Sequence, residues 1–250
     1  MAFSLKNHPF AVDAFFDQST VLTYALPKTQ LDGRIPACLQ PDVFRDANGV
    51  EWAFVALAMV QTRHLRPRGF PAWLGNDFFL IGYRIFVTYT TTAGKRLRGL
   101  YILKSETDKL IMSLLGAVFT HYNYSQIDLA ITENGSVQRI ISHKANLDIT
   151  IEQRAGEVAL PLGSPFLDWK TAQRYAGPLP FTFTYNPVTH EVLIIEGQRE
   201  KWTPGPVAVL AQQTSFWAEA GLETPILASA FTVKNIPYSW TKGRIEQWQP

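Results

Sequence analysis

A strict alternation from position 79 to position 89 constrains the fold of this 250-residue chain more than any other feature. Every odd position in this stretch is apolar or aromatic, which is the period of a β-strand with one buried face. Ala93, Gly94 and Lys95 interrupt the pattern as a turn, and an apolar pattern resumes from Leu97 to Leu103. The sequence therefore predicts a β-hairpin whose first strand buries its odd-numbered side chains.

The second strand of this hairpin is expected to lead directly into a helix. The run from Ser105 to Asp108 has the spacing of a capping box, with Ser105 as the N-cap. Apolar residues from Leu110 to Leu115 follow at helical spacing, so we expect a helix over residues 106–116. A second helix is expected over residues 165–175.

Composition favours β-structure and excludes several partners. Aromatic residues make up 13% of the chain and there are 16 prolines, which favours strands joined by many turns. The formal net charge of +2 is too close to zero to indicate a nucleic-acid partner or an anionic membrane surface. Cys38 is the only cysteine, so an intrachain disulfide is excluded and a reducing compartment is favoured.

No motif indicates a metal ion, a cofactor or a membrane segment. Lys6, His8 and Pro9 interrupt the first apolar residues, and the histidines lack metal-binding spacing. Glycine-rich phosphate-binding motifs and the GxSxG motif are absent from the sequence. We therefore expect a single domain over residues 1–250 in the cytoplasm, without a cofactor, and the sequence leaves open whether it forms a homo-oligomer.

The order of predicted elements indicates a mainly β fold. About ten short strands and two or three helices favour a mainly antiparallel sheet that is closed or nearly closed, because closure removes exposed edges. Asn134-Gly135 is a strong hairpin signal within this series. We do not expect a parallel sheet built from βαβ units.

Lys104, at the end of the second hairpin strand, is the candidate catalytic residue. A lysine amine has an ordinary pKa near 10.4 and is a poor nucleophile at neutral pH. An apolar pocket or a second cation favours the neutral amine, which can then form a Schiff base with a carbonyl compound. The alternative interpretation is a surface lysine that extends over apolar neighbours.

The length of the turn decides how Arg84 lies relative to Lys104. A three-residue turn pairs Thr92 with Arg96 and places Arg84 across from Lys104 on one face. A two-residue turn instead places Tyr83 across from Lys104 and turns Arg84 away. Because Ala93 is unfavourable in the tightest turns, we expect the first register, with both cations pointing into the sheet interior. There Arg84 is expected to clamp a substrate carboxylate.

Four segments of the sequence resemble the acetoacetate decarboxylase-like superfamily. They read NDFFLIGYRIFVTY, RGLYILKSETDKL, FTHYNY and FLDWKTAQRY, the last followed by a predicted hairpin. The resemblance covers about residues 20–235 and is to a branch of uncharacterised conserved bacterial proteins. It implies a conical antiparallel β-barrel with two main packed helices and a pocket inside the cone.

The same resemblance suggests where chemistry would occur. Decarboxylases of the family carry their Schiff-base lysine in a short lysine pair, and Lys104 falls at or within one residue of that place. Here Leu103 and Ser105 flank the lysine, and Leu80 or Ile81 stands where those enzymes carry a glutamate. Arg84 matches an arginine that is common in the uncharacterised branch.

Two functions follow from these patterns. In the first, the protein is a Schiff-base lyase for a small keto acid or carbonyl compound, with Lys104 as the nucleophile and Glu106 moving protons. In the second, the barrel is a non-catalytic binding module for a small apolar or amphipathic ligand. The residues expected to contact the ligand are Arg84, Tyr83, Phe86, Tyr101, His121 and Tyr122.

Overall fold

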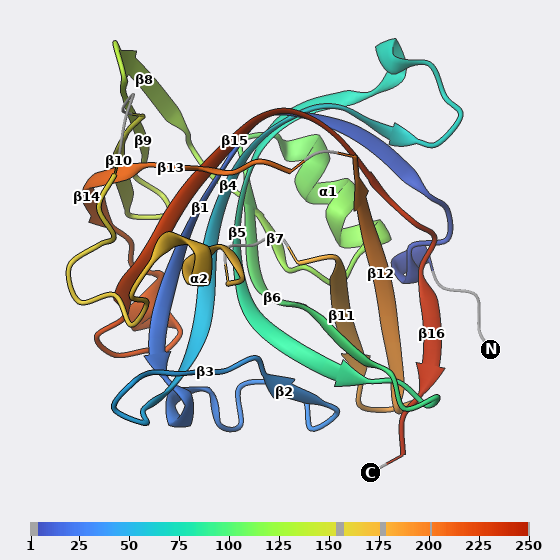
Figure 1. The fold of residues 1–250 in the computed structure, drawn as a ribbon. Coiled ribbons are helices and arrows are strands. Elements are labelled where there is room, and N and C mark those ends of the chain that lie inside the picture. Colours follow the sequence, from blue (N-terminus) through green and yellow to red (C-terminus); the bar gives the residue numbers. More distant parts are fainter. Residues whose placement is uncertain (1–4, 154–157, 176–178, 201, 250) are drawn as a thin grey trace.

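Long, curved β-strands dominate the computed structural model, which describes residues 5–153, 158–175, 179–200 and 202–249 (Figure 1). The main sheet has the order β13-β15-β1-β4-β5-β6-β11-β12-β16, and β12 also pairs with β15. Because this additional pairing returns the path to β15, the paired strands form a closed ring. The strands are β1 (Val12–Pro27), β2 (Leu39–Pro41), β3 (Phe44–Arg45), β4 (Glu51–Pro67), β5 (Asn76–Thr90), β6 (Arg96–Thr107), β7 (Tyr124–Gln126), β11 (Phe181–Asn186), β12 (Glu191–Arg199), β13 (Gly205–Pro206), β15 (Ile226–Trp240) and β16 (Arg244–Gln247).

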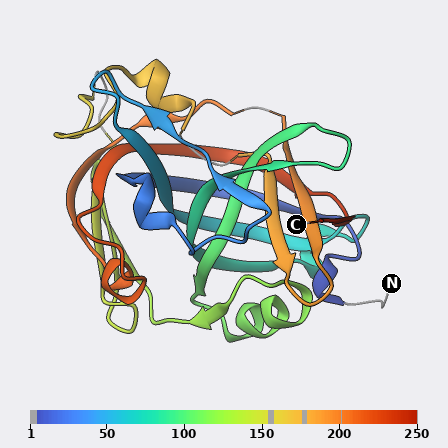
Figure 2. The same ribbon diagram turned by 90° about the horizontal axis from the view of Figure 1, so that it is seen from below.

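A second sheet of four strands and several short helices complete the described fold. The second sheet has the order β14-β10-β9-β8, and its strands are β8 (Ala130–Asn134), β9 (Val137–Ser142), β10 (Leu147–Glu152) and β14 (Ala208–Gln213). The helices are α1 (Leu110–Phe119), α2 (Trp169–Gln173), α3 (Phe216–Glu219), η1 (Leu5–Asn7), η2 (Lys28–Leu31) and η3 (Ala72–Leu74). Helices α1 and α2 lie on opposite sides of the molecule (Figure 2). Within the described ranges, every helix is too short or too polar to cross a membrane.

The predicted fold class is confirmed. Most strand pairs are antiparallel, and the parallel pairs are the short contacts that β6 makes with β7 and β11. The predicted hairpin at Asn134-Gly135 is present between β8 and β9, with Gly135 at a φ of 62°. Such a positive φ is the reason that glycine is favoured in tight hairpin turns.

The two faces of β5 pack against different parts of the molecule. Its odd-numbered side chains, from Phe79 to Tyr89, are buried in one apolar cluster with Ile149 of the second sheet and Phe216 of α3. We call this side of the sheet the Tyr83 face. The even-numbered side chains, including Arg84 and Phe86, point to the other side, which we call the cavity face. The predicted burial of the odd positions is thus confirmed.

The predicted start of the first helix is wrong. Residues 105–107 belong to β6, where they pair with β5 on one side and with β7 on the other. Helix α1 begins at Leu110, and Asp108 accepts a hydrogen bond from the Phe79 backbone nitrogen (2.7 Å) instead of capping a helix. Pairing on both edges satisfies the backbone groups that a cap would have served, so the strand continues past the capping-box pattern. The second helix, α2, is also shorter than predicted and begins after Asp168.

The register of the β5–β6 hairpin differs from our expectation in two ways. Thr90 lies opposite Arg96, so the turn is two residues longer than the predicted three-residue turn. This change alone would keep each side chain on its expected face, because the side-chain period of a strand is two. A β-bulge then shifts the pairing from Arg84 with Ile102 to Tyr83 with Lys104. Because β6 has one extra residue at the bulge, its side chains from Lys104 onward point to the opposite face from the predicted one. The predicted Arg84–Lys104 pair is therefore wrong.

Candidate functional site

A cavity of about 330 Å³ lies between the cavity face of the sheet and helix α1. Small residues of β4 make room for it: Ala56 and Ala58 line the cavity, whereas their neighbours Leu57 and Met59 fill the Tyr83 face. Met112 of α1 and other apolar side chains cover the opposite wall. A largely apolar, concave space with a few polar groups is the usual form of a small-molecule site.

Arg84 carries the charge in this cavity. Its side chain runs back along β5 over Gly82, where a Cβ would approach Arg84 Nε to 2.9 Å and Nη2 to 3.1 Å. Gly82 therefore provides the space that the guanidinium occupies. Arg84 Nε is buried and has no hydrogen-bond partner, and no described carboxylate forms an ion pair with this arginine.

The guanidinium of Arg84 is an uncompensated buried cation. Burial lowers its pKa, and the nearby Tyr238, Tyr124 and Tyr122 oppose that shift. An arginine nevertheless keeps its proton in proteins, so the positive charge remains in the cavity. Because an unpaired buried charge is costly, the cavity is electrostatically suited to an anion.

Three tyrosines surround this charge from distant parts of the chain. Tyr122 comes from the segment between α1 and β7, Tyr124 is the first residue of β7, and Tyr238 comes from β15. Burial raises the pKa of all three phenols, to about 12 for Tyr124. They are therefore neutral at physiological pH and can donate hydrogen bonds to an anion held by Arg84.

Lys104 does not reach the cavity. It lies on the Tyr83 face, where its Nζ is 2.8 Å from Glu106 Oε1 and 3.1 Å from Glu219 Oε2. Burial lowers the pKa of this amine, but the hydrogen bonds and charges of the two carboxylates outweigh burial and raise it overall. The expectation that Lys104 points into the same interior as Arg84 is wrong, and its amine is protonated rather than nucleophilic.

Other predicted ligand contacts are divided between the two faces. Tyr122 lines the cavity, and Phe86 lies on the cavity face but is packed in the core against Phe54. Tyr83 stacks on Phe216 of α3 at 3.8 Å between ring centroids, and its hydroxyl is 3.0 Å from Thr214 Oγ1. Tyr101 packs against the cluster of the Tyr83 face, and His121 is exposed away from the described lining of the cavity.

Several cavity residues were not predicted as ligand contacts. The predicted ligand contacts do not include Tyr124, Thr182, Tyr238 or His8, although all four line the cavity. Tyr124, Thr182 and Tyr238 lie on β7, β11 and β15, and His8 precedes β1, so they meet only when the ring of strands closes. The sequence carries no local signal for such meetings, because strand neighbours are set by long-range pairing.

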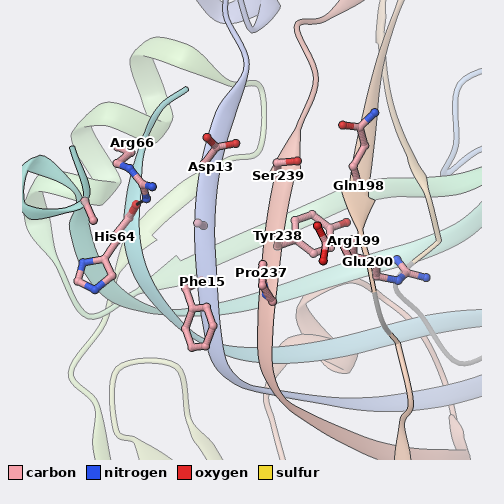
Figure 3. A pocket seen from close by; sticks show the side chains of 12 residues that line it. Asp13, Phe15, His64, Arg66, Gln198, Arg199, Glu200, Pro237, Tyr238 and Ser239 are labelled. Atoms are coloured by element: carbon pink, nitrogen blue, oxygen red, sulfur yellow. Dashed lines mark hydrogen bonds between the residues drawn. The ribbon is translucent and has the colours of Figure 1, made fainter. Parts of the chain in front are cut away.

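A second, wider depression lies beside the cavity (Figure 3). This outer groove has a volume of about 740 Å³ and shares Arg66 and Tyr238 with the cavity. Its Asp13 pairs with Arg68 at 3.1 Å, and Arg66 donates to the backbone oxygens of His64 and Phe70, each at 2.8 Å. Because these groups are already partnered, we take the enclosed cavity as the candidate site.

Metal coordination is not suggested by the side chains that the structure describes. In those parts of the chain, no group of three or more histidine, cysteine, aspartate or glutamate side chains could hold a metal ion. The chemistry that the site offers is therefore that of the Arg84 guanidinium, the backbone-bonded guanidinium of Arg66, the His8 imidazole, several neutral hydroxyl groups and an apolar wall.

Solved structures of the same fold are acetoacetate decarboxylase-like. One is an acetoacetate decarboxylase-like enzyme from Sphingomonas wittichii RW1, with 13% identity and a TM-score of 0.57 over 96% of this chain and 93% of that one. Another is the acetoacetate decarboxylase of Legionella pneumophila subsp. pneumophila str. Philadelphia 1, with 11% identity and a TM-score of 0.53 over 94% and 87%. The enduracididine biosynthesis enzyme MppR complexed with pyruvate has 9% identity and a TM-score of 0.53 over 98% and 91%. The expected acetoacetate decarboxylase-like fold is confirmed. Sequence identities this low show a shared fold and do not show a shared function.

The family is defined by sequence. The DUF2071 family of uncharacterized conserved proteins matches residues 14–246, and the chain belongs to this family. No curated protein sequence matches the chain.

Proposed function

We propose that the cavity binds a small amphipathic carboxylate, with Arg84 holding the carboxylate group. One observation carries the proposal: the guanidinium of Arg84, whose Nε is buried without a hydrogen-bond partner and which has no described carboxylate partner, lines a mainly apolar cavity. A carboxylate matches the planar fork of a guanidinium and can accept two parallel hydrogen bonds from it.

The rest of the lining supports an amphipathic rather than a purely polar ligand. The hydroxyl groups of Tyr122, Tyr124 and Tyr238 can donate to the remaining lone pairs of the carboxylate. The alanine and valine side chains of β4 and the apolar side chains of α1 can pack against an apolar body. A protein of similar fold, MppR, is described in complex with pyruvate, which is itself a small carboxylate.

The proposal is for non-covalent binding. Lys104, the amine expected to form an imine, lies on the Tyr83 face between two carboxylates. None of the described residues that line the cavity is a lysine. Keto acids stay within the proposed ligand class as carboxylates, but the described lining offers no amine for a Schiff base.

A calorimetric series tests the proposal. Straight-chain acids from butanoate to dodecanoate, phenylacetate and pyruvate are titrated into the protein beside the alcohols of matched length. The acids should bind and the alcohols should not. The variant Arg84→Met should weaken acid binding about 100-fold, because a buried charge pair loses one partner. Lys104→Met is the matched control and should bind the acids as the wild type does.

The variant Arg84→Met also separates a binding defect from a folding defect. Removing an unpaired buried charge is neutral or stabilising, so the melting temperature of this variant should not fall. Equal binding of acids and alcohols, or unchanged acid binding by a folded Arg84→Met variant, would exclude the proposed function.

A further inference from the structure

Two of the unpartnered buried polar atoms belong to the lining of the same cavity. Within the described residues, four buried side-chain atoms lack a hydrogen-bond partner, and they include Arg84 Nε and His8 Nδ1. Both Arg84 and His8 line the cavity. Buried polar groups in proteins are normally hydrogen-bonded, so unpartnered atoms on two residues of one lining indicate a ligand with two polar functions.

The position of His8 is fixed by its surroundings. Its backbone oxygen accepts a hydrogen bond from the Gly243 nitrogen at 2.8 Å, and its φ of 50° lies in the left-handed region. Any side chain at Gly243 would collide with the backbone oxygen of Asn7, which would stand 2.4 Å from a Cβ there. Two residues further on, Phe10 packs against Phe119 of α1 at 5.6 Å between ring centroids. A strained backbone held from two sides points to a placed side chain rather than an incidental one.

His8 and the guanidinium of Arg84 belong to positions far apart along β1. His8 precedes Val12, the first residue of β1. The guanidinium lies over Gly82, which pairs with Ala58, and Ala58 pairs with Val21 well inside β1. Because the strands run along the cavity wall, a ligand must extend along them to meet both groups.

The chemistry of His8 differs from that of Arg84. Burial lowers the pKa of the His8 imidazole, although a backbone hydrogen bond involving Thr241 opposes the shift. Apart from the three tyrosines, the titratable residues in the described lining are His8, Arg66 and Arg84, and no carboxylate is among them. The imidazole is therefore neutral near pH 7, and a neutral imidazole matches a hydroxyl or carbonyl group rather than a second anion.

We propose that His8 is a second ligand-binding residue of this cavity. The ligand class narrows accordingly to a carboxylate that carries a hydroxyl or carbonyl group at the far end of an apolar body. This inference rests on the proposed function, because it assigns Arg84 to the carboxylate end.

The test compares straight-chain acids of six to twelve carbons with their terminal hydroxy acids of the same length. Wild-type protein should prefer the hydroxy acid by about tenfold at one chain length, the usual contribution of one buried hydrogen bond. His8→Leu should remove this preference, so that the hydroxy acid and the plain acid of the same length bind with equal affinity. His8→Gln keeps a side-chain donor and acceptor and should retain part of the preference.

The outcomes separate the two proposals. If acids bind through Arg84 but wild-type protein shows no preference for the hydroxy acid at any length, the role of His8 is overturned and the carboxylate site stands. The same conclusion follows if a folded His8→Leu variant keeps the preference. If no acid of either kind binds the wild-type protein, both proposals are overturned.

Discussion

The two faces of the β5–β6 hairpin carry similar charges in opposite circumstances. On the Tyr83 face, Lys104 lies between Glu106 and Glu219, and its charge is compensated within the fold. On the cavity face, Arg84 has a comparable charge and no described carboxylate partner. Lys104 was chosen because it matches the position of the family's lysine, whereas Arg84 stands out because no described carboxylate balances its charge. The electrostatic balance around a side chain is therefore the better guide to function.

The contrast extends to what each face contributes to the protein. The Lys104 cluster ties β6 to α3, and Glu106 is almost fully buried there, with 2% of its side chain exposed. Such a cluster contributes to folding only while both signs are present. The charge of Arg84 opposes folding unless a ligand compensates it. We therefore assign the Tyr83 face to stability and the cavity face to binding.

The largest expected effect on stability is on the Tyr83 face. Lys104→Met removes the cation from beside the buried Glu106 and should lower the free energy of unfolding by about 2 kcal/mol. This value is smaller than for a fully buried pair because 29% of the Lys104 side chain is exposed. Urea denaturation measures the change, and calorimetry with octanoate should show unchanged affinity.

Lys95→Met provides the control for this prediction. Lys95 lies in the exposed β5–β6 turn, and its substitution should change the stability by less than about 0.5 kcal/mol. If Lys104→Met loses octanoate binding and Lys95→Met does not, Lys104 belongs to the ligand site. The division of roles between the two faces would then be wrong.

A smaller effect is expected at the glycine beneath the guanidinium. The variant Gly82→Ala adds a Cβ within 2.9 Å of the present position of Arg84 Nε, so the side chain must move. Carboxylate binding should weaken about tenfold, which is ~1.4 kcal/mol, because the displaced guanidinium is no longer aligned with the carboxylate group of the ligand. Calorimetry with the same straight-chain acids measures this loss.

The double variant Gly82→Ala/Arg84→Met shows whether the glycine acts through the arginine. In the absence of the guanidinium, the alanine should cause no further loss of affinity. Additive losses would mean that the new methyl group obstructs the cavity itself, and the role of Gly82 in placing Arg84 would then be dropped.

The smallest effect concerns the pH dependence of stability at Glu106. Burial raises the pKa of this carboxyl, although Lys104 acts in the opposite direction. A group with a raised folded-state pKa contributes stability at low pH and loses that contribution as the pH rises through the folded pKa. The unfolding free energy of Glu106→Gln relative to wild type should therefore increase as the pH rises above the ordinary glutamate pKa of about 4.3.

Glu219→Gln should show the opposite dependence. Hydrogen bonds from Ser215 and Lys104 lower the pKa of Glu219, so its contribution is present at neutral pH and is lost as the pH falls. The two variants are compared by urea denaturation at a series of pH values. Parallel pH profiles for the two variants would contradict the assignment of a raised pKa to Glu106.

Much of the fold was predictable because it depends on local patterns. The alternation from residue 79 to residue 89 predicted the buried face of β5, and Asn134-Gly135 predicted the β8–β9 hairpin. The capping-box pattern at Ser105 wrongly predicted a helix start, because β7 pairs with this segment and keeps it in β6. This pairing could not be predicted, because β7 comes after α1 in the chain and its position depends on that helix. Local propensity yields to tertiary pairing at such positions.

The candidate site was predictable only in part. Arg84 and Tyr122, two of the predicted ligand contacts, line the cavity, and Arg84 drew attention because an arginine among apolar strand residues is unusual. The face on which Lys104 lies was not predictable. One extra residue in β6 turns the following side chains to the opposite face, and the apolar pattern of the sequence does not reveal that residue. His8 and Tyr238 reach the cavity through long-range strand pairing, which a single sequence does not reveal.

The closed ring of strands has a consequence for the order of folding. Tyr238 and Arg84 stand more than half of the chain apart, and they meet only after β15 has paired with both β1 and β12. Contacts of such large sequence separation form slowly, because a long loop must be closed before they contribute. The cavity is therefore among the last features to appear during folding, and a carboxylate that binds there slows unfolding of the finished ring without accelerating its formation.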